Sequence, residues 1–370
     1  MVLKGKALRY TRHEITEQGL IEPGRCRILI MGVGGGGNNT LNRVMTLGVA
    51  GAQCIAVNTD IQHLEMIHAD KKILIGDKLT RGLGAGGKPY VGREAMLESR
   101  YKVESLVGET DVAFIAAGMG GGTGTGAAPI VADICRKKGA IVIGVVTIPF
   151  RHEKGRMNFA IQGLTEMRRA ANTTVIIDNN KLMDLVPQLP INEAFTRADE
   201  ILANMVKGIV ETITLPSLIN LDFADFRTIM EQGDIAIVGM GESDAPNRAE
   251  EAAKNAMSHL LLEVDYEGAS GALIHISGGR DLTLGEAVRT AEIVTEMMDE
   301  RALVIWGARV DPSLGDLLRV TLVLTGIRSP QILGGYRFPK MDLFNLEPNT
   351  GQEEPLKVEL GLYQMESKKR

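Results

Sequence analysis

The sequence predicts an α/β fold in which a doubly wound, mostly parallel sheet is joined by a long helix to a smaller α/β domain. Short apolar runs alternate with helical patterns through the first half of the chain, as they do in βαβ units. Several of these runs end directly in glycine-rich loops. A helical pattern of about 20 residues then precedes a second group of strands and helices, as an interdomain helix would.

The bulk composition indicates a globular cytoplasmic protein. The chain has 370 residues, 44% of them hydrophobic, and a formal net charge of −5, which argues against a nucleic-acid-binding surface. Its cysteines, Cys26, Cys54 and Cys135, are widely spaced, so we expect reduced thiols instead of disulfides or metal ligands. The sequence shows neither a signal peptide nor an apolar run long enough to span a membrane, and we expect no transmembrane insertion.

The first glycine-rich loop follows a predicted strand at Arg27–Met31 and precedes a helical pattern that runs to Leu47. Its residues, 32–39, satisfy the G-x-G-x-x-G spacing, and Asp60 follows the next predicted strand, 54–58. That arrangement is typical of nicotinamide-binding Rossmann domains. An NAD(P)-dependent oxidoreductase is therefore an open alternative.

A second loop follows a short predicted strand at Lys72–Ile75. Gly82, Gly87 and Lys88 have the spacing of a Walker A loop, but the next residue is Pro89. Proline lacks the hydroxyl that binds magnesium in such loops, so we reject that interpretation. We expect Pro89 to begin a long helix that reaches about Val107.

The third loop, Gly118–Gly126, carries the strongest signal. It lies between a predicted strand at Asp111–Ala117 and a predicted helix at Ala127–Lys138, with Pro129 expected in the first turn. Glycines allow backbone N–H groups to approach a ligand, and a helix N-terminus attracts an anion. The hydroxyls of Thr123 and Thr125 add donors, so this loop predicts a phosphate site.

Two further predicted strands, 140–147 and 174–177, lead into polar segments at 149–156 and 178–180. Every loop singled out so far therefore follows the carboxyl end of a strand. That edge is where ligands bind in doubly wound sheets. We expect the loops to form one pocket suited to a nucleoside triphosphate.

The remaining chain divides into a helix, a small domain and a tail. Apolar residues recur at helical spacing and spread around much of the predicted central helix, so we expect it to be buried between two domains. The tail is rich in Pro, Glu and Lys, with an apolar patch at Leu360–Met365, which predicts a largely disordered segment that carries a partner-binding peptide. The predicted divisions are an N-terminal extension at 1–24, a nucleotide-binding domain at 25–192, the central helix at 193–214, a C-terminal domain at 215–327 and the tail at 328–370.

The motifs together resemble those of the FtsZ branch of the tubulin/FtsZ superfamily of GTPases, over residues 28–327. The matches are GVGGGGNN at 32–39, NTD at 58–60, LTRGLGAG at 79–86, GMGGGTGTGAAP at 118–129, Pro149-Phe150 with Glu153 and Arg156, and NLDFAD at 220–225. The resemblance implies a tubulin-like variant of the Rossmann fold that hydrolyses GTP with Mg²⁺. The tail lacks the C-terminal peptide usual in bacterial members, which suits an archaeal division system.

The resemblance also implies roles for individual residues. Nucleotide contacts would come from Gly35, Gly36, Gly37, Asn38, Asn39, Asp60, Ala85, Gly86, Gly121, Gly122, Thr123, Gly124, Thr125, Glu153, Arg156, Asn179, Phe195 and Asp199. Among these, Asn179, Phe195 and Asp199 would bind guanine. A carboxylate accepts hydrogen bonds from the N1–H and N2–H of guanine, whereas adenine presents an acceptor at N1, so Asp199 would select guanine.

The catalytic residues implied by the resemblance are Asn220, Asp222 and Asp225. They follow the central helix, about 30 Å from its nucleotide end, so they could not easily reach the nucleotide of their own chain. The resemblance implies that they act on the nucleotide of the next subunit in a head-to-tail filament. The implied function is a self-assembling cytoskeletal GTPase that forms a division ring at midcell, on the inner face of the membrane. Membrane tethers and division regulators would bind the C-terminal tail.

Three departures from the family pattern bear on these assignments. Ser217 replaces a usual glycine, the spacing from Glu153 to Arg156 is one residue shorter than in common versions, and the tail lacks the usual bacterial C-terminal peptide. Besides the oxidoreductase, a nucleotide-binding scaffold that does not hydrolyse its ligand is therefore an open alternative.

Overall fold

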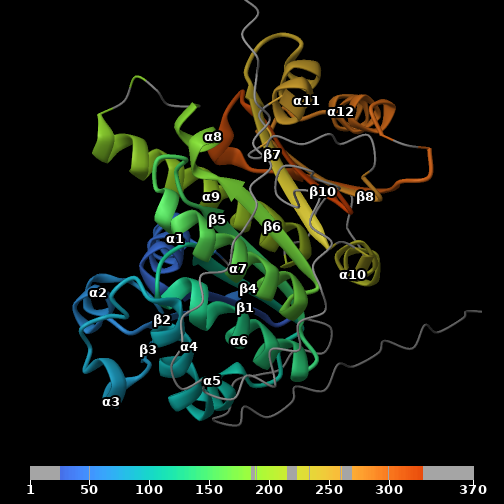
Figure 1. The fold of residues 1–370 in the computed structure, drawn as a ribbon. Coiled ribbons are helices and arrows are strands. Elements are labelled where there is room, and N and C mark those ends of the chain that lie inside the picture. Colours follow the sequence, from blue (N-terminus) through green and yellow to red (C-terminus); the bar gives the residue numbers. More distant parts are fainter. Residues whose placement is uncertain are drawn as a thin grey trace, which may run out of the picture.

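The structure, a computed structural model, contains a single ten-stranded sheet that runs through both halves of the chain (Figure 1). It describes residues 26–327 except 50, 185–187, 189, 215–222, 233, 259, 261–268 and 299. The strand order is β3-β2-β1-β4-β5-β6-β7-β10-β8-β9. Their bounds are β1 (Ile28–Val33), β2 (Ala52–Asn58), β3 (Lys71–Leu74), β4 (Val112–Gly118), β5 (Ile141–Ile148), β6 (Thr173–Asp178), β7 (Ile235–Ser243), β8 (Gly271–Gly278), β9 (Leu303–Val310) and β10 (Leu318–Thr325).

The sheet is mostly parallel, as the sequence predicts. The seven strands from β3 to β7 pair in parallel, as do β8 and β9, whereas β10 is antiparallel to both of its neighbours. The two halves of the sheet meet where β6 pairs with β7, through Thr174 with Ile235 and Val175 with Ala236. The halves are therefore joined by backbone hydrogen bonds as well as by a helix.

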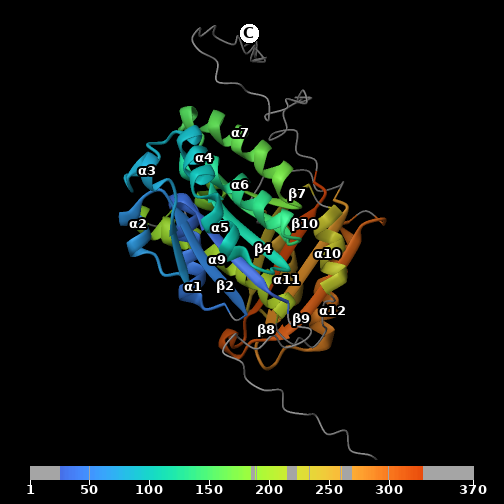
Figure 2. The same ribbon diagram turned by 90° about the horizontal axis from the view of Figure 1, so that it is seen from below.

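Helices cover both faces of the sheet, and each face has its own apolar core. One core includes side chains of α1 (Gly34–Leu47), α2 (Ile61–Met66), α9 (Ile191–Thr214) and α10 (Phe223–Gln232). The other includes side chains of α4 (Pro89–Glu98), α5 (Arg100–Val107), α6 (Thr123–Lys137), α7 (Lys154–Ala170), α11 (Arg248–Ser258) and α12 (Leu284–Glu296). Figure 2 shows α4, α6 and α7 on one side of the first strands and α1 on the other. The short helices α3 (Asp77–Thr80), α8 (Asn179–Asp184) and η1 (Pro312–Leu314) lie between strands and larger helices.

Three expected elements differ in the structure. The helix predicted at 89–107 is broken at Ser99 into α4 and α5, and the Ser99 hydroxyl accepts a hydrogen bond from the Gly76 N–H at 2.9 Å. Helix α6 begins at Thr123 instead of Ala127, which places Pro129 inside the helix and not in its first turn. Asp225, expected in an acidic loop, lies in the first turn of α10, whereas Ser217, Asn220 and Asp222 lie outside the described residues.

The central helix α9 is bonded to both halves of the molecule. The Lys207 ammonium donates to the carbonyl of Leu47, the last residue of α1, at 3.1 Å. One turn further along, Glu211 accepts from Arg309 of β9 at 2.5 Å. Helix α9 therefore connects α1 directly with the edge strand β9.

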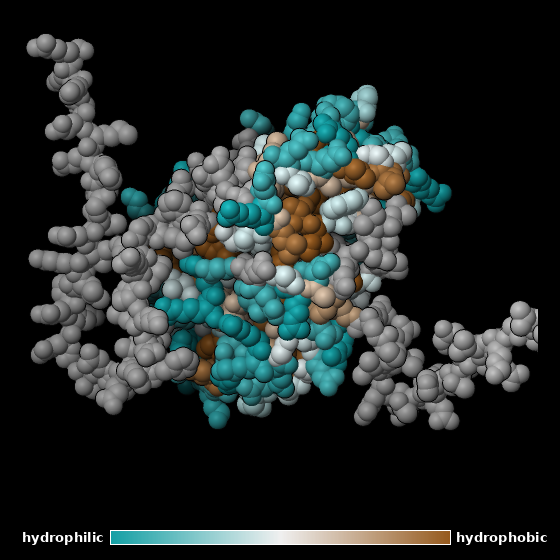
Figure 3. Space-filling view, turned by 90° about the vertical axis from the view of Figure 1, so that its right-hand side faces the viewer, coloured by the Kyte–Doolittle hydropathy of each residue, from teal (hydrophilic) through white to brown (hydrophobic). Residues whose placement is uncertain are grey.

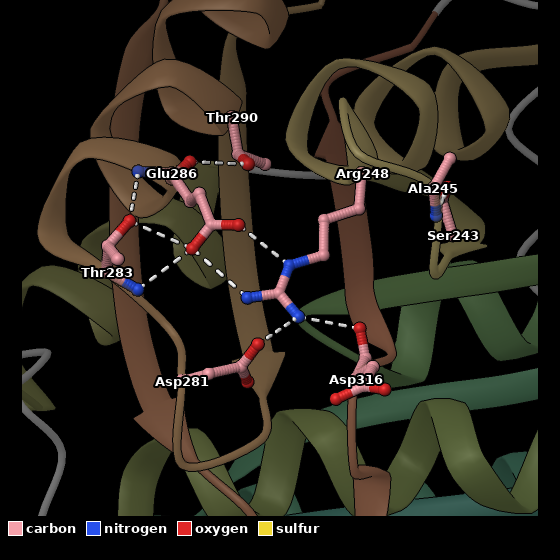
Figure 4. A network of polar contacts seen from close by, with 8 residues as sticks. All are labelled: Ser243, Ala245, Arg248, Asp281, Thr283, Glu286, Thr290 and Asp316. Carbon is pink, nitrogen blue, oxygen red and sulfur yellow. Dashed lines mark hydrogen bonds and ion pairs between the residues drawn. The ribbon is translucent and has the colours of Figure 1, made fainter.

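A buried arginine forms a network of ion pairs and hydrogen bonds in the second half of the chain (Figure 4). The Arg248 guanidinium, on α11, contacts Glu286 at 2.7 Å and Asp281 at 2.8 Å, and it donates to the carbonyl of Asp316 at 2.6 Å. These bonds hold the pKa of Glu286 at about 2, with the Arg248 hydrogen bond as the largest cause. The Glu286 carboxylate also accepts from the Thr283 N–H in a capping box at the start of α12. The network therefore ties α11, α12 and the loop before β10 to one point.

Among the described residues, no helix is both long enough and apolar enough to cross a bilayer.

Candidate functional site

A pocket of about 510 Å³ lies at the carboxyl edge of the parallel strands, within the range typical of small-molecule sites. Segments that follow six strands, β1 to β6, contribute to its lining. Predicted site residues in the lining are Gly35, Gly36, Asp60, Ala85, Gly121, Gly122, Thr123, Gly124, Glu153, Arg156 and Asn179. The topology thus brings together residues that are up to 144 positions apart in the sequence, from Gly35 to Asn179.

Two helices begin at this pocket. Helix α1 starts at Gly34 and α6 at Thr123, and neither has a side-chain cap or an acidic residue in its first turn. The first backbone N–H groups of a helix have no intrahelical acceptor, and the helix dipole adds positive potential at that end. The two helix starts therefore form a site for an anion with several negative oxygens, such as a polyphosphate.

Glycines serve two different purposes around the two helix starts. A Cβ at Gly37 would lie 2.0 Å from the Ala116 carbonyl oxygen, and one at Gly124 would lie 2.6 Å from the Gly118 oxygen. These glycines allow close packing of the helices on β4. At Gly35 and Gly121, in contrast, a Cβ would have no protein atom within 4 Å. Those two glycines leave open space in the pocket, where a ligand can approach the backbone.

The two threonines of the third loop are held in different ways. The Thr123 hydroxyl lies 2.7 Å from that of Thr59, and Thr123 lines the pocket. The Thr125 hydroxyl accepts a hydrogen bond from the Gly120 N–H at 2.9 Å and is buried. Thr125 therefore helps to fix the shape of the loop, and the ligand contact that the sequence suggests stays a prediction.

A histidine that sequence analysis missed joins the polar rim. The carboxylate of Asp60 accepts from the His63 N–H at 3.1 Å and caps α2. The two ring nitrogens of His63 lie 3.4 Å from Asn58 Nδ2 and 3.1 Å from Asn39 Oδ1. Spacing from the capping aspartate was the signal that could have identified His63. Other unpredicted lining residues are Asn58, Gly84, Gly87, Gly118, Met119, Thr147 and Pro149.

Glu153 and Arg156 form an ion pair at the opposite rim. The Arg156 Nη1 atom lies 2.7 Å from Glu153 Oε1, and the other carboxylate oxygen accepts from the Phe150 N–H at 3.1 Å. Despite the short spacing between them, both residues line the pocket. Arg156 is therefore oriented while its guanidinium stays largely exposed.

Several predicted residues are not among the described residues that line the pocket. Asn38 is fully buried and donates to the Val57 carbonyl at 3.4 Å, and Asn39 contacts His63. Gly86 lies in an exposed part of its loop, and the side chain of Phe195 lies outside the described residues. Asp199 lies on α9, where burial raises the pKa of its carboxyl to about 6 and Arg43 opposes that rise. Gly37 and Thr125 pack beneath the surface of the pocket.

The predicted catalytic residue Asp225 is far from this pocket. It is exposed on α10, beyond the end of α9, and a helix of that length extends about 36 Å. Figure 1 shows α8, beside the pocket, well separated from α10. Asp225 therefore cannot reach a ligand in the pocket of its own chain.

The part of the chain that the structure describes contains no cluster of three or more His, Cys, Asp or Glu side chains able to hold a metal ion. Burial raises the pKa values of Cys26, Cys54 and Cys135 to about 12. Thiolate chemistry at these positions is therefore disfavoured near neutral pH.

Comparison with known proteins gives consistent matches along the chain. Residues 27–187 match the GTPase domain of the Tubulin/FtsZ family, and residues 234–328 match the C-terminal domain of the FtsZ family. The chain is 52% identical to "Cell division protein FtsZ 2" of Methanocaldococcus jannaschii over 340 residues, which cover 91% of this chain and 90% of that protein. The Haloferax volcanii protein of the same description is 52% identical over 308 residues, covering 83% and 77%.

Solved structures agree with this result. The structure described as "FtsZ dimer, empty (M. jannaschii)" superposes with a TM-score of 0.79 at 49% identity, covering 82% of this chain and 88% of that chain. The structure of CetZ2 from Haloferax volcanii, described as a GTPγS-bound protofilament, gives a TM-score of 0.72 at 22% identity, with coverage of 83% and 96%. The second similarity concerns the fold alone.

Proposed function

The chain belongs to the FtsZ family of GTPases, and from that membership we propose that it binds GTP in the pocket described above and acts as a self-assembling cell-division protein. The observation that carries this proposal is the pair of uncapped helix starts, α1 and α6, beside glycines whose missing side chains leave open space. Such a site suits a triphosphate. The family match favours GTP over the dinucleotide that the G-x-G-x-x-G spacing allowed.

In this proposal, the pocket binds the nucleotide in three parts. Gly35–Asn39, Ala85, Gly86 and Gly121–Gly124 surround the phosphates, with Thr123 as a hydroxyl donor. Asp60, Glu153 and Arg156 contact the ribose and phosphate region. Asn179, Phe195 and Asp199 bind guanine, and the ionised form of Asp199 accepts its two ring-edge protons.

Magnesium fits this site as an ion carried mainly by the nucleotide. The described residues offer no three-ligand cluster, and Mg²⁺ commonly uses one or two protein oxygens together with phosphate oxygens and water. Asp60 and the Thr123 hydroxyl line the pocket and supply suitable oxygens. When bound, the ion would offset phosphate charge.

We also propose that hydrolysis is completed between subunits. Asp225 lies on α10, beyond the end of α9 that is farther from the pocket, and we propose that Asn220 and Asp222 act beside it. A head-to-tail contact would bring this acidic segment of one subunit to the nucleotide of the next, where the carboxylates orient the attacking water. Such a contact does not close on itself, so it produces an open filament.

The same proposal covers the organisation and location of the protein. Residues 25–192 form the GTP-binding domain, 193–214 the central helix and 215–327 the polymerisation domain, while 1–24 and 328–370 are extensions. The tail binds membrane tethers and division regulators, and the filaments assemble at midcell on the cytoplasmic face of the membrane.

The decisive experiment measures phosphate release from GTP against protein concentration. We expect a threshold concentration below which turnover is negligible, because isolated subunits have incomplete sites. Calorimetry with GTP, ATP and NADH should show binding of GTP alone. Turnover strictly proportional to protein concentration would contradict hydrolysis between subunits, and GTP binding without any turnover would identify a scaffold.

A mixing experiment sharpens the test. Asp225→Ala retains the pocket but lacks the proposed catalytic carboxylate. Gly121→Ala retains Asp225, but its added methyl group occupies space where we propose that the phosphates bind. At a GTP concentration too low to saturate the second variant, each should be nearly inactive alone, and the mixture should recover turnover. A mixture no more active than its parts would show that the two residues do not act across a subunit contact.

A further inference from the structure

In the part of the chain that the structure describes, the outer edge of the sheet in the second half is open. Strand β9 is the last strand in the order and pairs only with β8 among the described residues. An edge strand presents unpaired backbone N–H and C=O groups to any extended segment, and native proteins usually cover or blunt such an edge. This edge is therefore available for the addition of another strand.

A groove runs beside the open edge. It has a volume of about 470 Å³ and lies between α12 and Trp306 of β9, with Val288, Ala291 and Thr295 in its lining. Figure 3, which views the molecule from the side of this edge, shows hydrophobic surface exposed between hydrophilic surfaces. A strand added to β9 would place every second side chain in this groove, next to Trp306.

The groove carries negative charge at one end. Glu292 and Glu296 belong to its lining, and their side chains are 54% and 69% exposed. Both form ion pairs with Arg289. Six residues connect the end of α12, at Glu296, to the start of β9, at Leu303. The negative end therefore lies toward the beginning of β9.

The C-terminal tail has an apolar alternating segment and a basic end, which correspond to the apolar lining and the negative end of the groove. Residues 356–362 read Leu-Lys-Val-Glu-Leu-Gly-Leu, a strict alternation of apolar residues with other residues that is typical of a strand with one buried face. The chain then ends in Lys368, Lys369 and Arg370. A strand that runs antiparallel to β9 would direct the chain beyond Leu362, which leads to this basic end, past the end of the groove where Glu292 and Glu296 lie.

The connection is long enough for the tail to reach the groove of its own chain. Residue 325, at the end of β10, pairs with Gly271 of β8, which pairs with Leu303 of β9. Two strand spacings of about 4.8 Å thus separate the end of β10 from the start of the open edge. Residues 328–355 can extend to about 90 Å, so no geometric obstacle prevents docking within the same chain.

We propose that residues 356–362 add as an antiparallel strand to the edge of β9 of the same chain, with Leu356, Val358, Leu360 and Leu362 in the groove beside Trp306. The chain then leaves the groove past Glu292 and Glu296, toward its basic C-terminal residues. Docking covers the open edge and sequesters the apolar part of the tail. A partner that binds this part of the tail must first release it from the groove.

Hydrogen–deuterium exchange of the full chain, with GDP bound to prevent assembly, tests the proposal. A tethered segment has an effective concentration on the order of 1 mM. If the free segment bound with a dissociation constant of about 0.1 mM, the docked state would be about ten times as populated as the undocked state. The β9 amides that do not donate to β8 face the added strand. In the double variant Leu360→Asp/Leu362→Asp, we expect these amides to exchange about tenfold faster. Leu343→Asp with Leu346→Asp, in the same tail but outside the alternating segment, is the control and should change nothing.

A groove variant provides the complementary measurement. Thr295→Arg places a positive charge at an exposed position in the lining, where it should repel the basic end and accelerate the same exchange. Thr46→Arg is a matched control, because Thr46 is also exposed on a helix and also donates its hydroxyl to the carbonyl four residues earlier. The fluorescence of Trp306, the only tryptophan in the chain, should be quenched more strongly by a small dissolved quencher in both the tail and the groove variants.

Unchanged exchange of β9 in the Leu360/Leu362 double variant would overturn the proposal. Protection that rises with protein concentration would also overturn it, because the occupant would then be the tail of a second copy. Removal of residues 356–370 should give the same exchange pattern as the double variant, and a synthetic peptide of these residues should restore protection when added to the shortened chain.

Discussion

Gly121→Ala should separate ligand binding from folding. A Cβ at Gly121 would meet no protein atom within 4 Å, and its φ is not in the left-handed region. The added methyl group should therefore leave the stability of the ligand-free protein nearly unchanged. It would project into the space where we propose that phosphate oxygens approach the backbone.

The expected size of the effect follows from one lost contact. A hydrogen bond to a charged group contributes about 1.5–3 kcal/mol, and each 1.4 kcal/mol corresponds to about tenfold in affinity. We expect Gly121→Ala to weaken GTP binding by about 10- to 150-fold. Titration calorimetry measures the affinity, and thermal unfolding without nucleotide measures the stability.

Gly285→Ala is the matched control, because Gly285 also has room for a Cβ but lies on α12, away from the pocket. It should keep the GTP affinity of the unchanged chain. If Gly121→Ala bound GTP as tightly as the control, the phosphates would not approach this loop and the proposed pose would be wrong. If it unfolded at a much lower temperature, the argument from open space would fail.

Three other outcomes are expected. Asp225→Ala should bind GTP normally but lose turnover, whereas replacement of Glu231, an exposed carboxylate on the same helix, by Ala should leave turnover unchanged. Normal phosphate release by Asp225→Ala would exclude a catalytic role for Asp225. Because burial raises the pKa of Asp199 to about 6 and guanine needs the ionised form, GTP affinity should fall as the pH drops through about 6, and titrations of Asp199→Asn should lack that step. Gly37→Ala would place a methyl group 2.0 Å from the Ala116 carbonyl, so its midpoint of thermal unfolding should fall by several degrees, and an unchanged midpoint would show that α1 can shift away from β4.

Much of the fold is readable from the sequence because apolar runs and glycine loops repeat the βαβ pattern. The strand at 141–148 illustrates this, since a parallel strand buried on both faces must be continuously apolar. Local pattern fails where tertiary contacts decide. At the break, Ser99 accepts a hydrogen bond from Gly76, and near the early start of α6, Gly34 lies close against Gly124, which is 90 residues later in the sequence.

The candidate site shows the same division. Loop residues such as Gly35 and Gly121 could be predicted, because strand topology alone brings the loops to one edge. The structure distinguishes glycines that face open space from those, such as Gly37, that permit helix packing. It also identifies His63, whose partners Asn39 and Asn58 come from other segments. The spacing from Asp60 marks the position of His63, but its contacts with Asn39 and Asn58 depend on the fold.

The junction between β6 and β7 has a mechanical consequence. In the described part of the sheet, only two residue pairs join these strands, whereas every other neighbouring pair shares between four and eight. A load that pulls the two halves apart would thus break the fewest backbone hydrogen bonds along this line. Under such a load the molecule should yield there first, as two intact pieces that stay tethered by α9.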